Sequence, residues 1–228
     1  MTAAIVASTM CALAVARLVQ AERAGDRPGR LRWKPLASAA FVAVPLVGGA
    51  DLAAGATLAI VVGLALGAVG DLALMFDDER AFLGGLVAFL GGHVAYVVAL
   101  AQVVPSASWW TPAVGAVAVG AAGISLGVLR WLWPRLGAMR APVCAYVAVI
   151  TAMLVGGVAA TLVGDPHAAP AGARALLTAG ATLFFASDLA VAREKFMVRD
   201  VRNRTIGLPV YYLAQLAFGW AVLIPQLG

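Results

Sequence analysis

Charged residues are scarce in this chain of 228 residues: they make up only 12% of it, while 63% of its residues are hydrophobic. A soluble globular domain carries about twice that charged fraction and only about 45–50% apolar residues. The mean hydropathy of +0.94 is equally unlike that of a disordered protein. The composition therefore all but excludes a soluble enzyme and indicates a protein whose solvent is the lipid bilayer.

Cysteine is nearly absent as well. The two cysteines, Cys11 and Cys144, lie in separate apolar runs, and no C-x-x-C spacing occurs. This pattern supports neither a zinc site nor a structural disulfide, and both residues are interpreted as small buried apolar side chains. We expect no metal and no cofactor.

Long apolar runs dominate what the chain does contain. A helix needs about 20 predominantly apolar residues to cross the hydrocarbon core of a bilayer. Pro45 inside the second run predicts a kinked or tilted helix. We expect an all-α, polytopic fold in which residues 1–228 form a single integral membrane domain. Its eight expected transmembrane helices are residues 3–19, 35–50, 52–76, 81–104, 112–133, 142–163, 172–192 and 207–224.

Lysine and arginine occur almost entirely in alternate connections between these runs. Of the 16 such residues, only Arg174 falls on the other side. The positive-inside rule makes the basic side cytoplasmic, so both termini are expected outside a bacterial-type cytoplasmic membrane. Orientation thus explains the net charge of +5, and we expect no nucleic-acid partner.

A short repeat appears at two of the expected helix ends. Gly70-Asp71-Leu72-Ala73 and Ser187-Asp188-Leu189-Ala190 lie near the cytoplasmic ends of the third and seventh helices. Because these two helices run in the same direction, the repeat suggests two parallel four-helix halves. The oligomeric state cannot be inferred from it.

Few ionisable residues lie within the apolar runs. They are Asp71, His93 and Asp188, with Lys34 at a helix entrance. Burial in hydrocarbon costs such groups about 2.5–3.5 kcal/mol, so they are functional candidates. Two carboxyl groups in different environments can divide acid and base work, one protonated and one ionised. This favours hydrolysis of an acid-labile bond, with hydrogen bonds supplied by Tyr96, Tyr146, Ser187, Tyr211, Tyr212 and Gln215.

Structural roles are open for the same residues. Asp71 and Asp188 can instead form interfacial ion pairs with Arg80 or Arg193. His93 can serve as a hydrogen bond between packed helices, and Lys34 can extend to lipid phosphates.

Five sequence elements together resemble the YhhN-like lysoplasmalogenase family of integral membrane proteins. The elements, in the family's order, are Lys34-Pro35, Gly70-Asp71, Gly85-Leu86-x-x-Phe89-x-x-x-His93-x-x-Tyr96, Ser187-Asp188 and Tyr211-Tyr212-x-x-Gln215. The resemblance implies an eight-helix hydrolase that cleaves the vinyl ether bond of lysoplasmalogens to a fatty aldehyde and a glycerophospho-ethanolamine or -choline. Its partners are then a lysophospholipid substrate and membrane lipid.

The resemblance also implies roles for individual residues. Asp71 and Asp188 are expected to be catalytic. The expected substrate-binding residues are Lys34, His93, Tyr96, Ser187, Tyr211, Tyr212 and Gln215.

The chemistry of the vinyl ether agrees with the residue pattern. Its hydrolysis begins with protonation of the double bond, and water then captures the oxocarbenium ion. Asp188 is the slightly favoured acid, because its apolar neighbours Phe184, Phe185 and Leu189 favour a protonated carboxyl group. The ionised partner then stabilises the cation and orients water.

Two other functions compete with this one. A small transporter or lipid-binding membrane protein would use Asp71 and Asp188 for proton coupling, and it would leave its substrate chemically intact. A metal-dependent lipid amidase or esterase needs several metal ligands, and a single intramembrane histidine is too few.

Overall fold

The computed structural model describes residues 1–76 and 78–224, and these form a bundle of eight long α-helices with no strand among them. Short 3-10 turns, η1 (Ser106–Trp110), η2 (Trp133–Arg135) and η3 (Gly137–Met139), lie in the connections. The expected all-α fold is confirmed. The helices are α1 (Thr2–Ala24), α2 (Arg27–Gly48), α3 (Gly55–Ala73), α4 (Glu79–Val103), α5 (Pro112–Leu132), α6 (Arg140–Val163), α7 (Ala171–Phe196) and α8 (Val201–Ala221).

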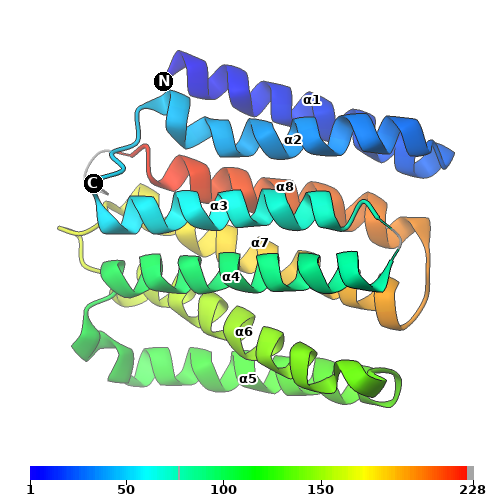
Figure 1. Cartoon of the computed structure of the whole chain (residues 1–228). Helices are drawn as coiled ribbons and strands as arrows, with labels where there is room; N and C mark the ends of the chain where they lie inside the picture. The colour runs from blue at the N-terminus through cyan, green and yellow to red at the C-terminus, as the bar shows by residue number, and fades with distance from the viewer. Residues whose placement is uncertain (77, 225–228) are drawn as a thin grey trace.

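Consecutive helices alternate in direction along the bundle (Figure 1). Helices α3 and α7 consequently run the same way, as two parallel four-helix halves require. Helix α8 contacts α1, α2, α3 and α7, whereas α5 packs chiefly against α6 at the edge of the molecule. Polar side chains on α8 can therefore meet residues from both halves of the chain.

Two helices begin earlier than hydropathy indicates. Helix α2 starts at Arg27 rather than residue 35, because the Asp26 carboxylate caps it by accepting from the Gly29 amide at 3.1 Å. Helix α8 starts at Val201 rather than residue 207, with Asp200 as its cap. The first turns of both helices are polar and so lie outside the apolar runs. As a result, Lys34 lies inside α2 rather than ahead of it.

Within residues 1–76 and 78–224, six helical segments are long and apolar enough to cross a membrane. They comprise Thr2–Ala24, Gly55–Ala73, Glu79–Val103, Pro112–Arg135, Gly137–Val163 and Ala171–Phe196. The two helices outside this set, α2 and α8, are those that carry Lys34, Tyr211 and Gln215. Eight membrane-spanning helices were expected, and six of the eight observed helices have the length and composition to span a membrane.

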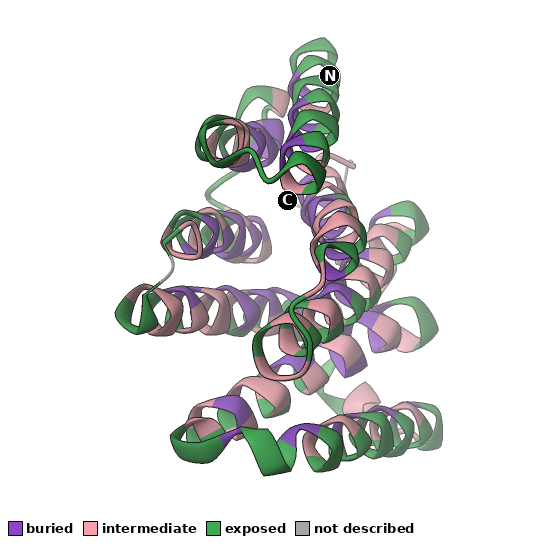
Figure 2. Cartoon of the chain, turned by 90° about the vertical axis from the view of Figure 1, so that its right-hand side faces the viewer, coloured by how far each residue is buried: buried purple, intermediate pink, exposed green. Residues whose placement is uncertain are grey.

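Buried residues lie on the inner sides of the helices, and exposed residues lie on the outer sides (Figure 2). Large apolar side chains such as Val87, Val119 and Leu126 are exposed on the outside. Such a surface is unfavourable in water and suits contact with lipid chains.

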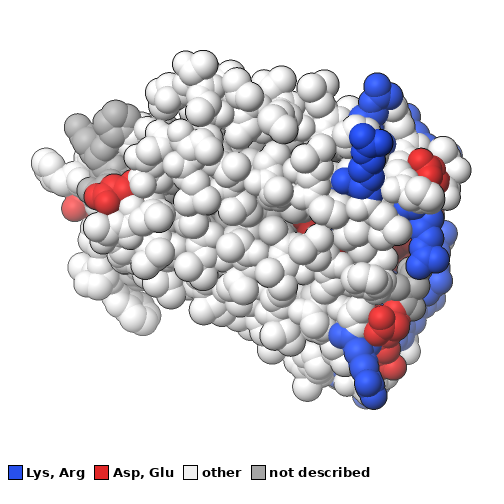
Figure 3. All heavy atoms as spheres, turned by 45° about the horizontal axis from the view of Figure 1, so that its top comes forward, with Lys and Arg blue, Asp and Glu red and all other residues white. Residues whose placement is uncertain are grey.

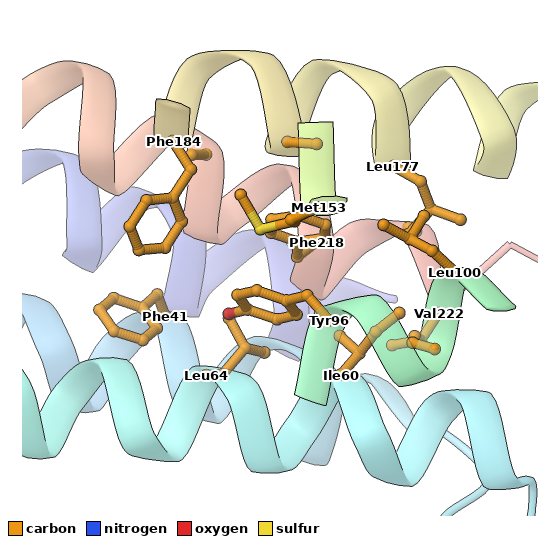
Figure 4. Close-up of a cluster of buried hydrophobic side chains, with 14 of the residues drawn as sticks. Phe41, Ile60, Leu64, Tyr96, Leu100, Met153, Leu177, Phe184, Phe218 and Val222 are labelled. Carbon is orange, nitrogen blue, oxygen red and sulfur yellow. The ribbon is translucent and has the colours of Figure 1, made fainter. Parts of the chain in front are cut away.

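The centre of the bundle is an aromatic cluster built from four helices (Figure 4). Tyr96 of α4 stacks on Phe218 of α8, with ring centroids 4.0 Å apart. Phe41 of α2 and Phe184 of α7 complete the cluster beside them. Helix α3 approaches closely because it presents glycine there: a Cβ at Gly67 would overlap the Gln215 amide.

Candidate active site

The basic residues gather at one end of the bundle (Figure 3). This is the end where α1 joins α2, α3 joins α4, α5 joins α6 and α7 joins α8 (Figure 1). A cavity of about 450 Å³ extends from this end into the protein, and all eight helices contribute to its lining. Its outer part is charged, with Arg30 and Arg204 among the lining residues, and its inner part contains both Asp71 and Asp188.

Asp71 is surrounded by hydrogen-bond donors from α2 and α8. Ser38 donates to its Oδ2 at 2.6 Å, and the Tyr212 hydroxyl donates to the same atom at 3.3 Å. The Lys34 ammonium lies 3.4 Å from Oδ1. Lys34 and Ser38 are four residues apart on α2 and therefore share one helix face. The carboxyl group is almost fully buried, with 4% of the side chain exposed.

A chain of polar side chains connects Asp71 to the middle of the bundle. Tyr96 donates to Gln215 Oε1 at 2.6 Å, and Gln215 Nε2 donates to the Tyr211 hydroxyl at 3.0 Å. The Tyr211 hydroxyl is thereby left free to donate to Asp71, with which it interacts. Each group in this chain thus donates a hydrogen bond to the next one, in the direction of Asp71.

Asp188 has a different set of neighbours. Tyr146 of α6 donates to its Oδ2 at 2.5 Å, and His93 Nε2 lies 3.8 Å from the same oxygen. Oδ1 has no hydrogen bond within residues 1–76 and 78–224, and 18% of the side chain is exposed to the cavity. Asp188 is therefore the more accessible of the two carboxyl groups.

The orientation of the His93 ring is fixed by its backbone partner. Nδ1 lies 2.6 Å from the Phe89 carbonyl oxygen, which can only accept, so Nδ1 carries the proton. In the neutral imidazole Nε2 is then an acceptor, and this buried atom has no hydrogen-bond partner among the described residues. Phe184 packs against the ring with centroids 4.4 Å apart and separates His93 from Tyr211.

The structure divides the expected site residues into two layers. Lys34, Asp71, Ser187, Asp188 and Tyr211 line the cavity. The remaining four, which hold those residues in place, are buried behind the lining: His93, Tyr96, Tyr212 and Gln215.

The structural ion pairs considered from sequence do not occur in the described part of the chain. Asp71 pairs with Lys34 rather than Arg80, and Arg193 donates to Asn203 rather than pairing with Asp188. Nor do three or more potential metal ligands cluster within the described ranges.

Two residues of the site are additional to those assigned from sequence. Ser38 follows Lys34 by one helical turn, and that spacing is the only signal of its position. Tyr146 was expected as one of several possible hydrogen-bond donors, but no pattern in α6 singles it out as the partner of Asp188.

The fold and the site together define a class: an all-helical membrane protein with two carboxyl groups, one buried and one partly exposed, in a single cavity beneath a basic end. The model of the YhhN family matches residues 29–222. The chain therefore belongs to the YhhN family.

Curated relatives carry a more specific name. A protein named lysoplasmalogenase from Mycobacterium tuberculosis (strain CDC 1551 / Oshkosh) is 31% identical over 159 residues, which cover 67% of this chain and 54% of that protein. Lysoplasmalogenase TMEM86A from Bos taurus is 32% identical over 162 residues, or 69% of this chain and 62% of its own length. The chain thus spans little more than half the length of the curated relatives it matches. No solved structure matches it significantly.

Proposed function

We propose that this protein hydrolyses the vinyl ether bond of a lysoplasmalogen, releasing a fatty aldehyde and a glycerophospho-ethanolamine or -choline. The observation that carries this proposal is the presence of Asp71 and Asp188 in one cavity, within an apolar bundle and beneath a basic end. The name lysoplasmalogenase, which the curated relatives bear, supports the same reaction.

In the proposed topology all eight helices span the membrane, and the basic end faces the cytoplasm. The chain termini then lie outside. The cavity entrance lies at the headgroup level of the inner leaflet, where a single-chain amphiphile dissolved in the bilayer can enter. Its alkyl chain would lie against apolar side chains of α5 and α6 such as Val128, Leu132, Val147 and Ile150.

Asp188 is the proton donor in this mechanism. Its Oδ2 accepts from Tyr146, which leaves Oδ1 to carry the proton that is transferred. Transfer of this proton to the β-carbon of the vinyl ether leaves an oxocarbenium ion and the Asp188 carboxylate.

Asp71 stabilises the cation that forms. Its neighbours donate hydrogen bonds or carry positive charge, and that arrangement suits a carboxylate rather than a carboxylic acid. A fixed negative charge beside the reacting carbon lowers the energy of the oxocarbenium ion, because the charge is in place before the reaction begins.

His93 and Asp188 position the attacking water. Nε2 and Oδ2 are two acceptors 3.8 Å apart, and Nε2 lies buried just behind the cavity lining; a water molecule admitted between them as the substrate binds would donate to both. The water oxygen bonds to the oxocarbenium carbon, and its proton passes to Asp188, giving a hemiacetal. Asp188 then protonates the glycerol oxygen as the carbon–oxygen bond breaks, and it recovers a proton from the hemiacetal hydroxyl. One water is consumed and the acid is regenerated.

The test is release of aldehyde from lysoplasmenyl-ethanolamine by protein purified in maltoside detergent. The matched control substrate is the saturated 1-alkyl ether, which has no double bond to protonate. We expect aldehyde from the vinyl ether and none from the alkyl ether. Recovery of both lipids intact, with a folded and monodisperse protein, would contradict the proposal and favour a transporter.

A further inference from the structure

We propose that Arg30 and Lys34 form a subsite for the phosphate group of a glycerophospholipid, one helical turn from the reacting bond. The inference rests on the proposed function and extends it, because it assigns the part of the cavity that binds the headgroup phosphate of the substrate. The ligand is a phosphate ester on a glycerol backbone.

The first support is the placement of the cations on α2. Arg27, Arg30, Leu31 and Lys34 all line the cavity. Their spacing of three and four residues places them on one face of the helix. Lys34 lies at the inner end of this row, beside Asp71, and Arg30 lies one turn closer to the basic end.

The second support is that Arg30 has donors to spare. Its Nη1 lies 3.6 Å from Glu22 Oε2, which is too long for a hydrogen bond. Its buried Nε has no hydrogen-bond partner among the described residues. A guanidinium group whose donors are not used up within the protein matches the oxygens of a phosphate.

The third support is that Glu22 does not need Arg30. Arg204 donates to Glu22 Oε2 at 2.9 Å and also lies 3.3 Å from Glu194. The carboxylate of Glu22 is thus already paired across the helices α1 and α8. The charge of Arg30 is available to a ligand, and its removal leaves Glu22 with a counterion.

The spacing along α2 fits a glycerol backbone. Residues four apart on a helix are separated by about 6 Å along its axis. Lys34 contacts Asp71 and Arg30 lies one turn further out, so a phosphate held mainly by Arg30 lies about one helical turn from Asp71, where the proposed reaction occurs. In a lysoplasmalogen the three glycerol carbons separate the phosphate oxygen from the ether oxygen by a similar length. A phosphate joined directly to the alkenyl chain would not reach both places.

The experiment compares two substrates with the same alkenyl chain. Lysoplasmenyl-ethanolamine carries the phosphate, and 1-alkenylglycerol lacks it. We expect Arg30→Gln to lower kcat/KM for the phospholipid about ten- to a hundredfold, mainly through KM. The same variant should leave kcat/KM for the alkenylglycerol unchanged, and Arg30→Lys should recover part of the loss.

The matched control is Arg130→Gln, which removes an exposed cation of α5 that does not line the cavity. It should change neither substrate's kinetics. An equal loss on both substrates with Arg30→Gln would show a structural role and overturn the subsite, as would no loss on either.

Competition by soluble anions separates a lipid headgroup from free phosphate. Glycerol 3-phosphate should inhibit the wild type, and inhibition should weaken in Arg30→Gln. Equally strong inhibition by inorganic phosphate would indicate a free-anion site and overturn the spacing argument.

A binding measurement keeps this inference separate from the proposed reaction. Isothermal titration of the saturated 1-alkyl lysophospholipid into maltoside-solubilised protein involves no bond cleavage. Arg30→Gln should weaken this binding and leave binding of 1-alkylglycerol unaltered. If the wild type cleaves no vinyl ether, that result still supports the subsite, and identical binding by both proteins still overturns it.

Discussion

At the scale of single residues, the two carboxyl groups differ in what surrounds them. Asp71 is enclosed by Lys34, Ser38 and Tyr212, while Asp188 lines the cavity with 18% of its side chain exposed. Sequence alone indicated both carboxyl groups, because ionisable residues in apolar runs are rare. It could not indicate Ser38, nor single out Tyr146 from the other possible hydrogen-bond donors as the partner of Asp188, because both roles depend on which helices pack together. For the same reason, the sequence could not indicate which site residues line the cavity and which are buried behind the lining.

Neutralising each carboxyl group should have different consequences. Asp188→Asn removes the proton donor, and we expect aldehyde release to fall about a thousandfold or more. Asp71→Asn removes only the stabilising charge, and we expect a fall of about a hundredfold. Turnover measured with lysoplasmenyl-ethanolamine checks both. Asp51→Asn, an exposed carboxylate outside the cavity, is the control that should keep full activity. Full turnover by Asp188→Asn would rule out the acid assignment.

Two substitutions of His93 separate its two nitrogens. His93→Asn keeps a donor near the Nδ1 position, towards the Phe89 carbonyl, but has no acceptor at the Nε2 position. His93→Gln extends an acceptor towards the Nε2 position, where water is proposed to bind. We expect His93→Gln to retain more activity than His93→Asn.

A labelling measurement adds a readout that stability does not affect. In D₂O, slower water capture in His93→Asn should return the oxocarbenium ion to substrate, so unreacted lipid gains deuterium at the vinyl carbon. Equal activity of the two variants, with unlabelled substrate in both, would show that Nε2 has no part in water capture.

At the scale of helices, hydropathy located every long helix but misplaced two starts. The polar turns that begin α2 and α8 follow capping aspartates, and a hydropathy pattern does not register them. The packed structure explains why α3 carries a glycine at position 67, which the sequence alone does not. Gly67 faces Gln215 and Tyr211, so its lack of a side chain lets the hydrogen-bonded chain behind Asp71 form.

Adding a methyl group at Gly67 should therefore disturb both stability and activity. We expect Gly67→Ala to destabilise the protein by about 1–3 kcal/mol, as overpacking does, and to reduce turnover by displacing Gln215. Gly123→Ala on α5 is the matched control, because a Cβ there meets no other atom. Thermal unfolding in detergent, followed by turnover, tests this pair. Similar melting temperatures for both variants and the wild type would contradict the packing argument.

At the scale of the whole molecule, the arrangement places a charged entrance over an apolar interior. Lysine and arginine, apart from Arg174, occupy one end (Figure 3). The cavity that contains both carboxyl groups is also lined by charged residues of that end. The positions of lysine and arginine between the apolar runs predict this asymmetry in charge, because cations in the loops set the orientation of a membrane protein. The cavity itself depends on how eight helices pack, and no single helix sequence contains that information.

The proposed orientation predicts which end is labelled from outside the cell. Of two introduced cysteines, Ser108→Cys lies in the connection between α4 and α5, at the end without basic loops, and Arg199→Cys lies between α7 and α8, at the basic end. In intact cells a membrane-impermeant maleimide should label the first and leave the second unlabelled until the membrane is opened. The parent protein, in which Cys11 is buried and Cys144 is partly exposed, gives the background. The reverse labelling pattern would invert the proposed topology.

The most direct test of the central claim is the fate of one solvent proton. Lysoplasmenyl-ethanolamine is hydrolysed in D₂O, and the aldehyde is reduced at once to its alcohol for mass spectrometry. Protonation of the vinyl ether by Asp188 predicts one solvent deuterium on the carbon next to the carbonyl, with no such product from Asp188→Asn. Aldehyde without that deuterium would contradict carbon protonation, and labelled aldehyde from Asp188→Asn at the wild-type rate would contradict the assignment of the acid.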